Sequence, residues 1–170
     1  MLTAKGKYGL KALAHLAALG PGESTQAVEI AKANNIPKKF LDAILGELRN
    51  AGMVYSRKGP GGGYMLARAA GDIKLGQVVR TIDGPLAPIA CASRSAYQPC
   101  RDCKSVRSCA VRLTMTKVRD AISEVLDRMT IADIVAIREG NNIAPMVPRG
   151  RASQDRKPGR GTRALANSNS

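Results

Sequence analysis

PKKFLDAILGELRNAGMVYSRKGPGGGYML, residues 37–66, joins a helical apolar pattern to a glycine-rich hairpin pattern. Its apolar residues recur at intervals of three and four, which predicts a helix over about 37–51 with one buried face, made of Leu41, Ile44, Leu45 and Leu48. Gly52 ends this helix, because glycine readily adopts the left-handed conformation that follows many helices. Two short extended runs, residues 54–58 and 64–68, flank a five-residue turn containing four glycines and predict a β-hairpin.

Two further helices are predicted before this segment and one after it. The first covers residues 5–19, and the second begins near Ser24 or Thr25, either of which can cap its free N–H groups. A short helix over residues 75–83 follows the hairpin and is closed by Gly84-Pro85. Helix, helix, turn, helix and hairpin in this order predict a mainly α fold, a winged helix-turn-helix with a two-stranded wing.

The second half of the chain predicts a long helix with an apolar seam. Residues 110–129 carry apolar side chains spaced 4, 3, 4, 3 and 4 apart, at Val111, Met115, Val118, Ile122, Val125 and Met129. Such a heptad seam needs a partner helix, so we expect a homodimer. We divide the chain into a winged domain (1–84), a cysteine loop (85–110), a dimerisation helix with a short terminal helix (111–139) and a disordered basic tail (140–170).

The charge of the chain favours a polyanionic partner. Of the 170 residues, 27 are Lys or Arg and 13 are Asp or Glu, a formal net charge of +14. The tail from residue 141 holds six basic residues and one acidic residue, so the rest keeps 21 basic and 12 acidic residues and a net charge of +9. Aromatic residues make up 3%, too few for the base-stacking that single-strand binders use, which favours duplex DNA.

Basic residues stand where a winged helix touches DNA. Lys38 and Lys39 lie at the start of the third helix, the end that usually contacts bases and phosphates in a major groove, and Asp42 follows one turn later. Arg57 and Lys58 directly precede the glycine turn, so a cation is expected at the wing tip, near the minor groove. A merely solvated charged face is the alternative for these pairs, and their place in this order of elements argues against it.

An enzyme is not expected. No catalytic His or carboxylate pair is evident, Cys100-x2-Cys103 lacks the strand–helix context of a redox motif, and the glycine run leads into a strand rather than a helix, unlike a nucleotide loop. No apolar run reaches the ~18 residues that span a bilayer. We therefore expect a cytoplasmic protein without membrane contact, in which four cysteines indicate metal or redox chemistry rather than structural disulfides.

The sequence resembles the Rrf2 family of IscR- and NsrR-like winged-helix regulators over about residues 1–137. The resemblance rests on Ile30-Ala31, Phe40-Leu41, Leu45, Leu48, Ala51-Gly52, the run from Ser56 to Tyr64, residues 75–79 and residues 130–134. It implies a DNA-binding transcriptional regulator, a repressor in our reading, that senses iron, redox or nitric oxide status. Together with the pattern above, it gives the residues expected at the DNA: Thr25, Lys38, Lys39, Phe40, Asp42, Ser56, Arg57, Lys58, Gly61 and Gly62.

Two positions depart from this resemblance at the DNA. Cluster-binding members carry Glu-Gln where this chain has Asp42-Ala43, and Arg where it has Lys58. Lys is a weaker bidentate reader of bases than Arg. A changed operator sequence is therefore expected.

The resemblance also implies an iron–sulfur cluster, of the 2Fe–2S or 4Fe–4S type, held by the cysteines. Cys103-x5-Cys109 matches the half-motif of the family and Cys91 the upstream ligand, while Arg112 stands at the position of a ligand His and cannot ligate. Cys100 is then the fourth ligand expected within the chain, with a group of the partner subunit as the alternative. Tetrahedral zinc, metal-free thiol chemistry and a small-molecule ligand remain open as other modes of sensing.

Overall fold

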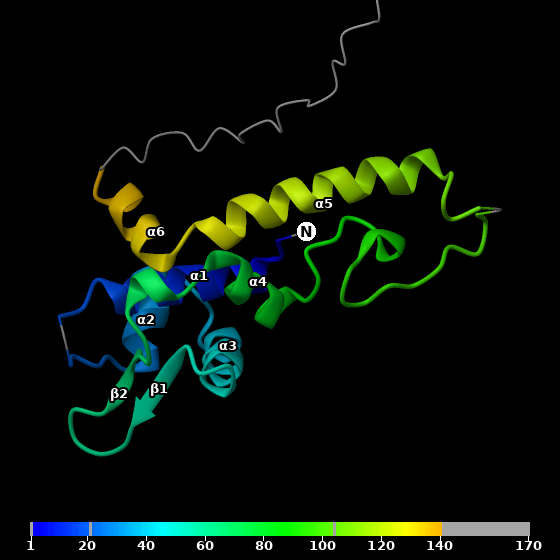
Figure 1. The fold of residues 1–170 in the computed structure, drawn as a ribbon. Coiled ribbons are helices and arrows are strands. Elements are labelled where there is room, and N and C mark those ends of the chain that lie inside the picture. The colour runs from blue at the N-terminus through cyan, green and yellow to red at the C-terminus, as the bar shows by residue number, and fades with distance from the viewer. Residues whose placement is uncertain (1, 21, 104, 141–170) are drawn as a thin grey trace, which may run out of the picture.

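The computed structural model describes residues 2–20, 22–103 and 105–140, so the predicted basic tail from residue 141 lies outside the described residues. Its elements run along the chain (Figure 1) as α1 (Ala4–Ala17), α2 (Ala27–Asn34), α3 (Lys38–Asn50), β1 (Val54–Arg57), β2 (Gly63–Leu66), the 3-10 turn η1 (Ala70–Asp72), α4 (Leu75–Asp83), the 3-10 turn η2 (Ala90–Ala92), α5 (Ala110–Arg128) and α6 (Ile131–Arg138). The predicted fold class, mainly α with a two-stranded wing, is confirmed. Among these residues, every helix is too short or too polar to cross a bilayer.

One apolar core joins α1, α2, α3 and α4. Its fully buried members come from each of these helices and from the start of α6, and include Leu13, Ile30, Leu41, Ile44, Leu45, Leu48, Val78 and Ile131. The three-and-four spacing predicted for α3 is therefore its buried face. Because this face turns inward, the opposite side of α3 is left in solvent.

The N-cap of α2 lies one or two residues later than predicted. Gln26, not Ser24 or Thr25, precedes the first helical turn, and its backbone N–H donates to the carboxylate of Glu29 at 3.0 Å. The Thr25 hydroxyl donates to the same carboxylate at 2.6 Å. A reciprocal cap of this kind satisfies helix N–H groups that would otherwise lack partners, which explains why α2 begins there.

The wing is an antiparallel pair in which Val54 lies opposite Leu66 and Arg57 opposite Gly63. Its second strand is also fastened to the turn before α2, where Thr25 N donates to Tyr64 O at 3.1 Å and Tyr64 N to Thr25 O at 2.8 Å. A Cβ at Gly63 would lie 2.4 Å from the carbonyl oxygen of Thr25. Glycine at this position therefore allows the wing to approach the helical core.

The chain returns to the winged unit after the long helix. Leu75 N donates to Met129 O at 2.9 Å and Ile131 N donates to Ile73 O at 3.0 Å, so the end of α5 is paired with the start of α4. α6, which Thr130 and Asp133 cap, packs against α1. The last described helix thus belongs, by its contacts, to the same packed unit as α1–α4.

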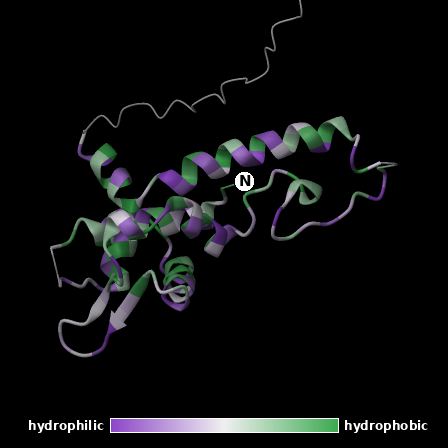
Figure 2. Cartoon of the chain, in the orientation of Figure 1, coloured by the Kyte–Doolittle hydropathy of each residue, from purple (hydrophilic) through white to green (hydrophobic). Residues whose placement is uncertain are grey.

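The long helix α5 has no buried residue, although it spans 19 residues. Figure 2 shows apolar and polar segments alternating along it. Four residues of the predicted seam are at least 36% exposed: Val111, Val118, Ile122 and Val125. An apolar stripe of this kind on a single helix is the feature expected of a helix with a partner.

Alanine substitutions at two glycines are expected to have opposite effects on stability. Gly63→Ala places a Cβ against the Thr25 backbone, which cannot move aside, so we expect unfolding free energy to fall by about 1–3 kcal/mol, the usual cost of overpacking. Gly46→Ala, inside α3, meets no atom within 4 Å and is expected to add up to about 1 kcal/mol, because alanine favours a helix. Urea unfolding of both variants and of the unmodified protein measures this; equal stabilities for the two variants would contradict the close approach at Gly63.

Candidate nucleic-acid interface and cysteine site

The N-terminal turn of α3 presents four of the predicted DNA-binding residues to solvent. Lys38, Lys39, Phe40 and Asp42 are all exposed, and Phe40 is 57% exposed although it is aromatic. Lys38 Nζ lies 2.7 Å from Asp42 Oδ2, one turn along the helix. Exposed pairs of this spacing contribute about 0.3–0.5 kcal/mol, so the lysine can exchange its carboxylate for a phosphate at little cost.

The wing carries its two cations on a fastened loop. Ser56, Arg57 and Lys58 are exposed. Behind them the Ser24 hydroxyl donates to Gly61 O at 3.0 Å, and Gly62 N donates to Gly59 O at 2.9 Å. Gly61 has φ +71°, a conformation that L side chains rarely adopt. These bonds limit how far the loop can move, so the wing cations have a defined position relative to α3.

Thr25 and Gly62 are engaged within the protein. Thr25 is 8% exposed, and both its backbone and its hydroxyl already have partners. A Cβ at Gly62 would lie 2.3 Å from Arg57 O. Their contact with DNA remains a prediction, but both residues shape the surface on which Arg57 and Lys58 stand.

The recognition surface and the long helix lie on different sides of the molecule. Figure 1 shows β1, β2 and α3 together at one end of the winged unit, with α5 running along the other side of α1 and α4. β1 and α3 are also in direct contact. The exposed cations of α3 and of the wing therefore lie on neighbouring elements, which together make the candidate interface, away from the helix expected to dimerise.

The four cysteines come together although they span 19 positions of the chain. Cys103 Sγ lies 3.6 Å from Cys109 Sγ. Donor atoms of Cys100, Asp102 and Cys103 lie within 4.8 Å of one another, and Cys91 lies beside Cys100. All four are free thiols. Asp102 was missed by sequence reasoning, although its place between two cysteines is a signal of a possible oxygen ligand.

The ionisation of these thiols is set by their neighbours. Hydrogen bonds from the backbone N–H groups at the start of α5, first that of Arg112, and a bond from the Cys103 thiol lower the pKa of Cys109. The Cys100 thiol and then burial raise the pKa of Cys91, and the Cys109 thiol and then burial raise the pKa of Cys103. The helix N-terminus thus favours the ionised form of Cys109, which is the form that a metal ligand requires.

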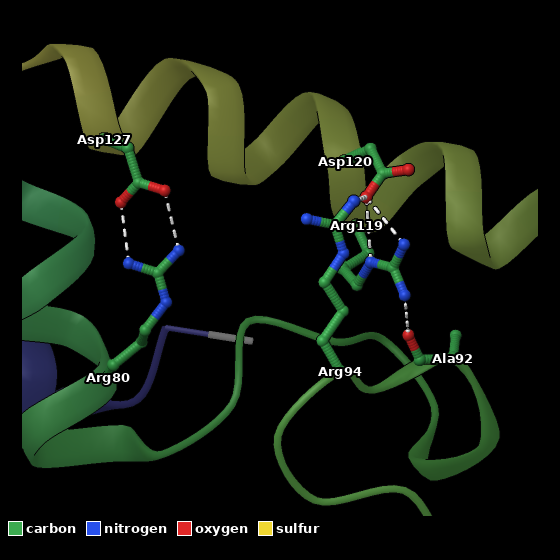
Figure 3. A network of polar contacts seen from close by, with 6 residues as sticks. All are labelled: Arg80, Ala92, Arg94, Arg119, Asp120 and Asp127. Atoms are coloured by element: carbon green, nitrogen blue, oxygen red, sulfur yellow. Dashed lines mark hydrogen bonds and ion pairs between the residues drawn. The ribbon is translucent and has the colours of Figure 1, made fainter.

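Arginines of α5 bind the backbone beside Cys91 rather than the thiols. Arg112 Nε donates to Cys91 O at 2.9 Å, and Arg119 donates through Nη1 to Ala92 O (Figure 3). Arg119 and Arg94 both pair with Asp120, at 2.7 and 3.0 Å. The pKa shifts of Cys91, Cys103 and Cys109 follow from neighbouring thiols, burial and backbone N–H groups.

A second ion pair connects the long helix to the winged unit. Both guanidinium Nη atoms of Arg80 on α4 donate to the Asp127 carboxylate, at 2.6 and 2.8 Å (Figure 3). This bond lowers the pKa of Asp127 and raises that of Arg80. A Cβ at Gly76 would lie 2.0 Å from the carboxylate, so glycine there lets α4 and α5 approach.

Comparison with known proteins agrees with this arrangement. The family model Rrf2, described as an iron-dependent transcriptional regulator, matches residues 2–137. An rrf2-like HTH-type transcriptional regulator of Rhodobacter capsulatus is 43% identical over 150 residues, which cover 86% of this chain and 99% of the relative.

Two solved structures share the fold. CymR, the global cysteine regulator of B. subtilis, superposes with a TM-score of 0.67 and 31% identity over 81% of this chain and 97% of its own. IscR of T. potens gives a TM-score of 0.64 and 29% identity over 85% and 92%. The winged fold, the family model over most of the chain and the full-length relative lead to one conclusion: this chain belongs to the Rrf2 family of winged-helix transcriptional regulators.

Proposed function

We propose that this regulator is a cytoplasmic homodimer that binds an operator in duplex DNA, acts as a repressor, and senses iron, redox or nitric oxide status through an iron–sulfur cluster. One observation carries the proposal: the chain holds an exposed cationic surface on α3 and the wing, and four thiols gathered between α4 and the start of α5. α5 packs against α4, which itself packs against α3, so the candidate DNA site and the candidate signal site lie on elements of one packed unit.

In this proposal, α3 and the wing make the contacts with the DNA grooves. The N-terminal turn of α3 fits a major groove about 12 Å wide, where Lys38 and Lys39 contact phosphates or base edges. Arg57 and Lys58 follow the adjacent backbone or enter the minor groove. Phe40, which is exposed at the same turn, supplies an apolar surface for a thymine methyl group.

Dimerisation is assigned to the exposed seam of α5. Burying the apolar surface of Val111, Val118, Ile122 and Val125 against a second copy gives the stripe the cover it lacks in one chain. Two copies related by a two-fold axis then present two copies of α3, which fits a palindromic operator whose half-sites are about one DNA turn apart.

The donor set fits an iron–sulfur cluster. Two thiolates on one tetrahedral metal ion with bonds of about 2.3 Å lie about 3.8 Å apart, close to the 3.6 Å between Cys103 and Cys109. Cys91 and Cys100 complete a set of four soft ligands. When bound, such a cluster supplies a redox-active, oxygen- and nitric-oxide-sensitive group. The protein supplies the N–H groups of α5 that stabilise the Cys109 thiolate, and the buried position of Cys91.

Thiol chemistry without a cluster is the second candidate. Cys103 and Cys109 are free and close enough for a disulfide after a small movement, and the structural relative CymR is a cysteine regulator. A zinc ion on the same four thiols, or a small-molecule ligand, would also make a cluster-free sensor. Metal and sulfide content of protein purified without oxygen separates these candidates from a cluster.

Removing the wing cations is expected to weaken DNA binding. The double variant Arg57→Ala, Lys58→Ala should lower affinity for a duplex site selected from a random pool and should reduce the salt dependence of log K by about 2, because each lost phosphate contact removes about one unit. The control Lys117→Ala, Arg128→Ala removes the same charge from α5 and should keep the slope. Fluorescence anisotropy over a salt series measures both; an unchanged slope in the wing variant would make the wing assignment wrong.

A charge in the seam is expected to produce a monomer. Ile122→Asp buries a carboxylate without a partner in the proposed dimer, which is strongly unfavourable, and the monomer should bind a palindromic site at least about tenfold more weakly. Lys117→Asp changes an exposed residue about 140° away around the same helix and should remain dimeric. Sedimentation velocity gives the assembly state, and a dimeric Ile122→Asp protein would exclude α5 as the interface.

Loss of one thiol is expected to abolish the cluster. Cys91→Ala, Cys103→Ala and Cys109→Ala should each lack visible absorption after anaerobic purification, while Ser108→Ala, beside Cys109, should keep it. Cys100→Ala should weaken the chromophore if Cys100 is the fourth ligand and leave it intact if a partner group takes that place. A colourless unmodified protein containing neither iron nor sulfide would exclude the cluster, and one zinc per chain would identify the alternative metal.

A further inference from the structure

We infer that Arg112 and Arg119 of α5 are positioning residues that hold the turn bearing Cys91, and thereby place this thiol beside the other three. The inference rests on the proposed function, since it explains how the gathered thiols are kept ready for a common ligand. It concerns two side chains that reach no thiol in the structure. These two arginines and the carbonyl groups that they bind form the Cys91 clamp.

The clamp consists of two charge-assisted hydrogen bonds from one helix face. Arg112 donates to the carbonyl of Cys91 at 2.9 Å and Arg119 to the carbonyl of Ala92. Residues seven apart lie on the same side of an α-helix, two turns from each other, so both guanidinium groups reach the same short turn. Bonds from a charged donor are the stronger kind, and the backbone they hold carries Cys91 directly.

Cys91 needs such an anchor more than the other cysteines do. Cys109 is fixed as the residue that caps α5, and Cys103 and Cys100 lie within nine residues of it. Cys91 precedes them by a further nine positions, in a loop whose ordering costs conformational entropy. Cys91 is nevertheless only 4% exposed as a residue, and its thiol lies beside Cys100. The clamp supplies the polar contact that holds this distant ligand in place.

The surroundings of Arg119 indicate that its position is built rather than incidental. Its side chain is 12% exposed, and burying a guanidinium is unfavourable unless its charge is paired and its N–H groups are bonded. Asp120 accepts from Arg119 Nε at 2.9 Å and from Nη2 at 2.7 Å, which leaves Nη1 directed at Ala92 O (Figure 3). The carboxylate thus orients the guanidinium toward the Cys91 turn.

The test measures whether the clamp protects the Cys91 thiol. Metal-free, reduced, full-length protein is treated with iodoacetamide under native conditions, and the modification of each cysteine is followed by mass spectrometry. In the protein without substitutions, Cys91 should react more slowly with iodoacetamide than Cys100, which is more exposed. Arg112→Gln and the double variant Arg112→Gln, Arg119→Gln should speed the modification of Cys91, by about tenfold or more in the double variant, because local opening replaces the lost bonds.

Two matched variants separate positioning from a general loss of structure. Arg94→Gln removes a 75% exposed member of the same network that does not touch the clamped carbonyls, and should leave Cys91 protected. Arg112→Lys keeps a cationic donor and should restore part of the protection. The melting temperature of each variant is measured alongside, and Arg112→Lys carries the comparison if a glutamine variant does not fold.

A second readout connects the clamp to the cluster. The visible absorption of anaerobically purified Arg112→Gln protein should be lost faster under a chelator than that of the Arg94→Gln protein. Unchanged alkylation of Cys91 in both glutamine variants would overturn the clamp. A colourless unmodified protein in which the clamp still protects Cys91 would instead overturn the cluster and leave the clamp standing, so the two failures are distinguishable.

Discussion

The burial of one face of α3 against α1 and α4 is the interaction on which the rest of the molecule depends. Leu41, Ile44, Leu45 and Leu48 are fully buried, so the side chains between them must face solvent. The exposure of the cations at the start of α3 follows from this constraint, because the buried face leaves the opposite side of the helix in solvent. The wing inherits its position from the same packing, because β1 contacts α3 and β2 is bonded to the turn before α2.

The same core also determines where the long helix can lie. Ile131, the first residue of α6 and the third after α5 ends, is fully buried, and the Arg80–Asp127 pair fastens the final turns of α5 to α4. The far end of the helix carries Cys109 at its cap and holds the Cys91 turn through two arginines. α5 thus contacts α4 at one end and the Cys91 turn at the other. In the dimer that we propose, a local change among the thiols would act through these contacts on the relative position of the two recognition helices.

Sequence periodicity predicted most of the fold because each helix has its own apolar repeat. The bounds of α4 and α5 agree with the prediction to within one residue, and Gly52 and Gly84 take the positive φ expected where a helix ends. The start of α2 was placed too early, because capping rules favour Ser or Thr at the N-cap, whereas Gln26 takes that position and pairs with Glu29.

The candidate site was less accessible to sequence reasoning. The spacing of the cysteines predicted that they act together, but not that Arg112 and Arg119 would bind backbone carbonyls from across the loop. Such contacts depend on tertiary structure, and their one signal in the sequence is a pair of arginines seven residues apart on a helix otherwise read for its apolar seam. The close approach of Gly63 to the Thr25 backbone likewise depends on tertiary structure, so the sequence did not indicate why glycine is needed there.

Coupling between the thiols and DNA binding is tested by the operator affinity of one anaerobic preparation, measured before and after its cluster is removed with a chelator. An absorption spectrum with iron and sulfide counts shows beforehand that the cluster is intact. We predict that both forms remain dimeric and that their affinities for the selected duplex differ, since α5 contacts both the turn that carries Cys91 and helix α4, which packs against α3. Equal affinities of the loaded and stripped protein would contradict it and would make the four cysteines structural.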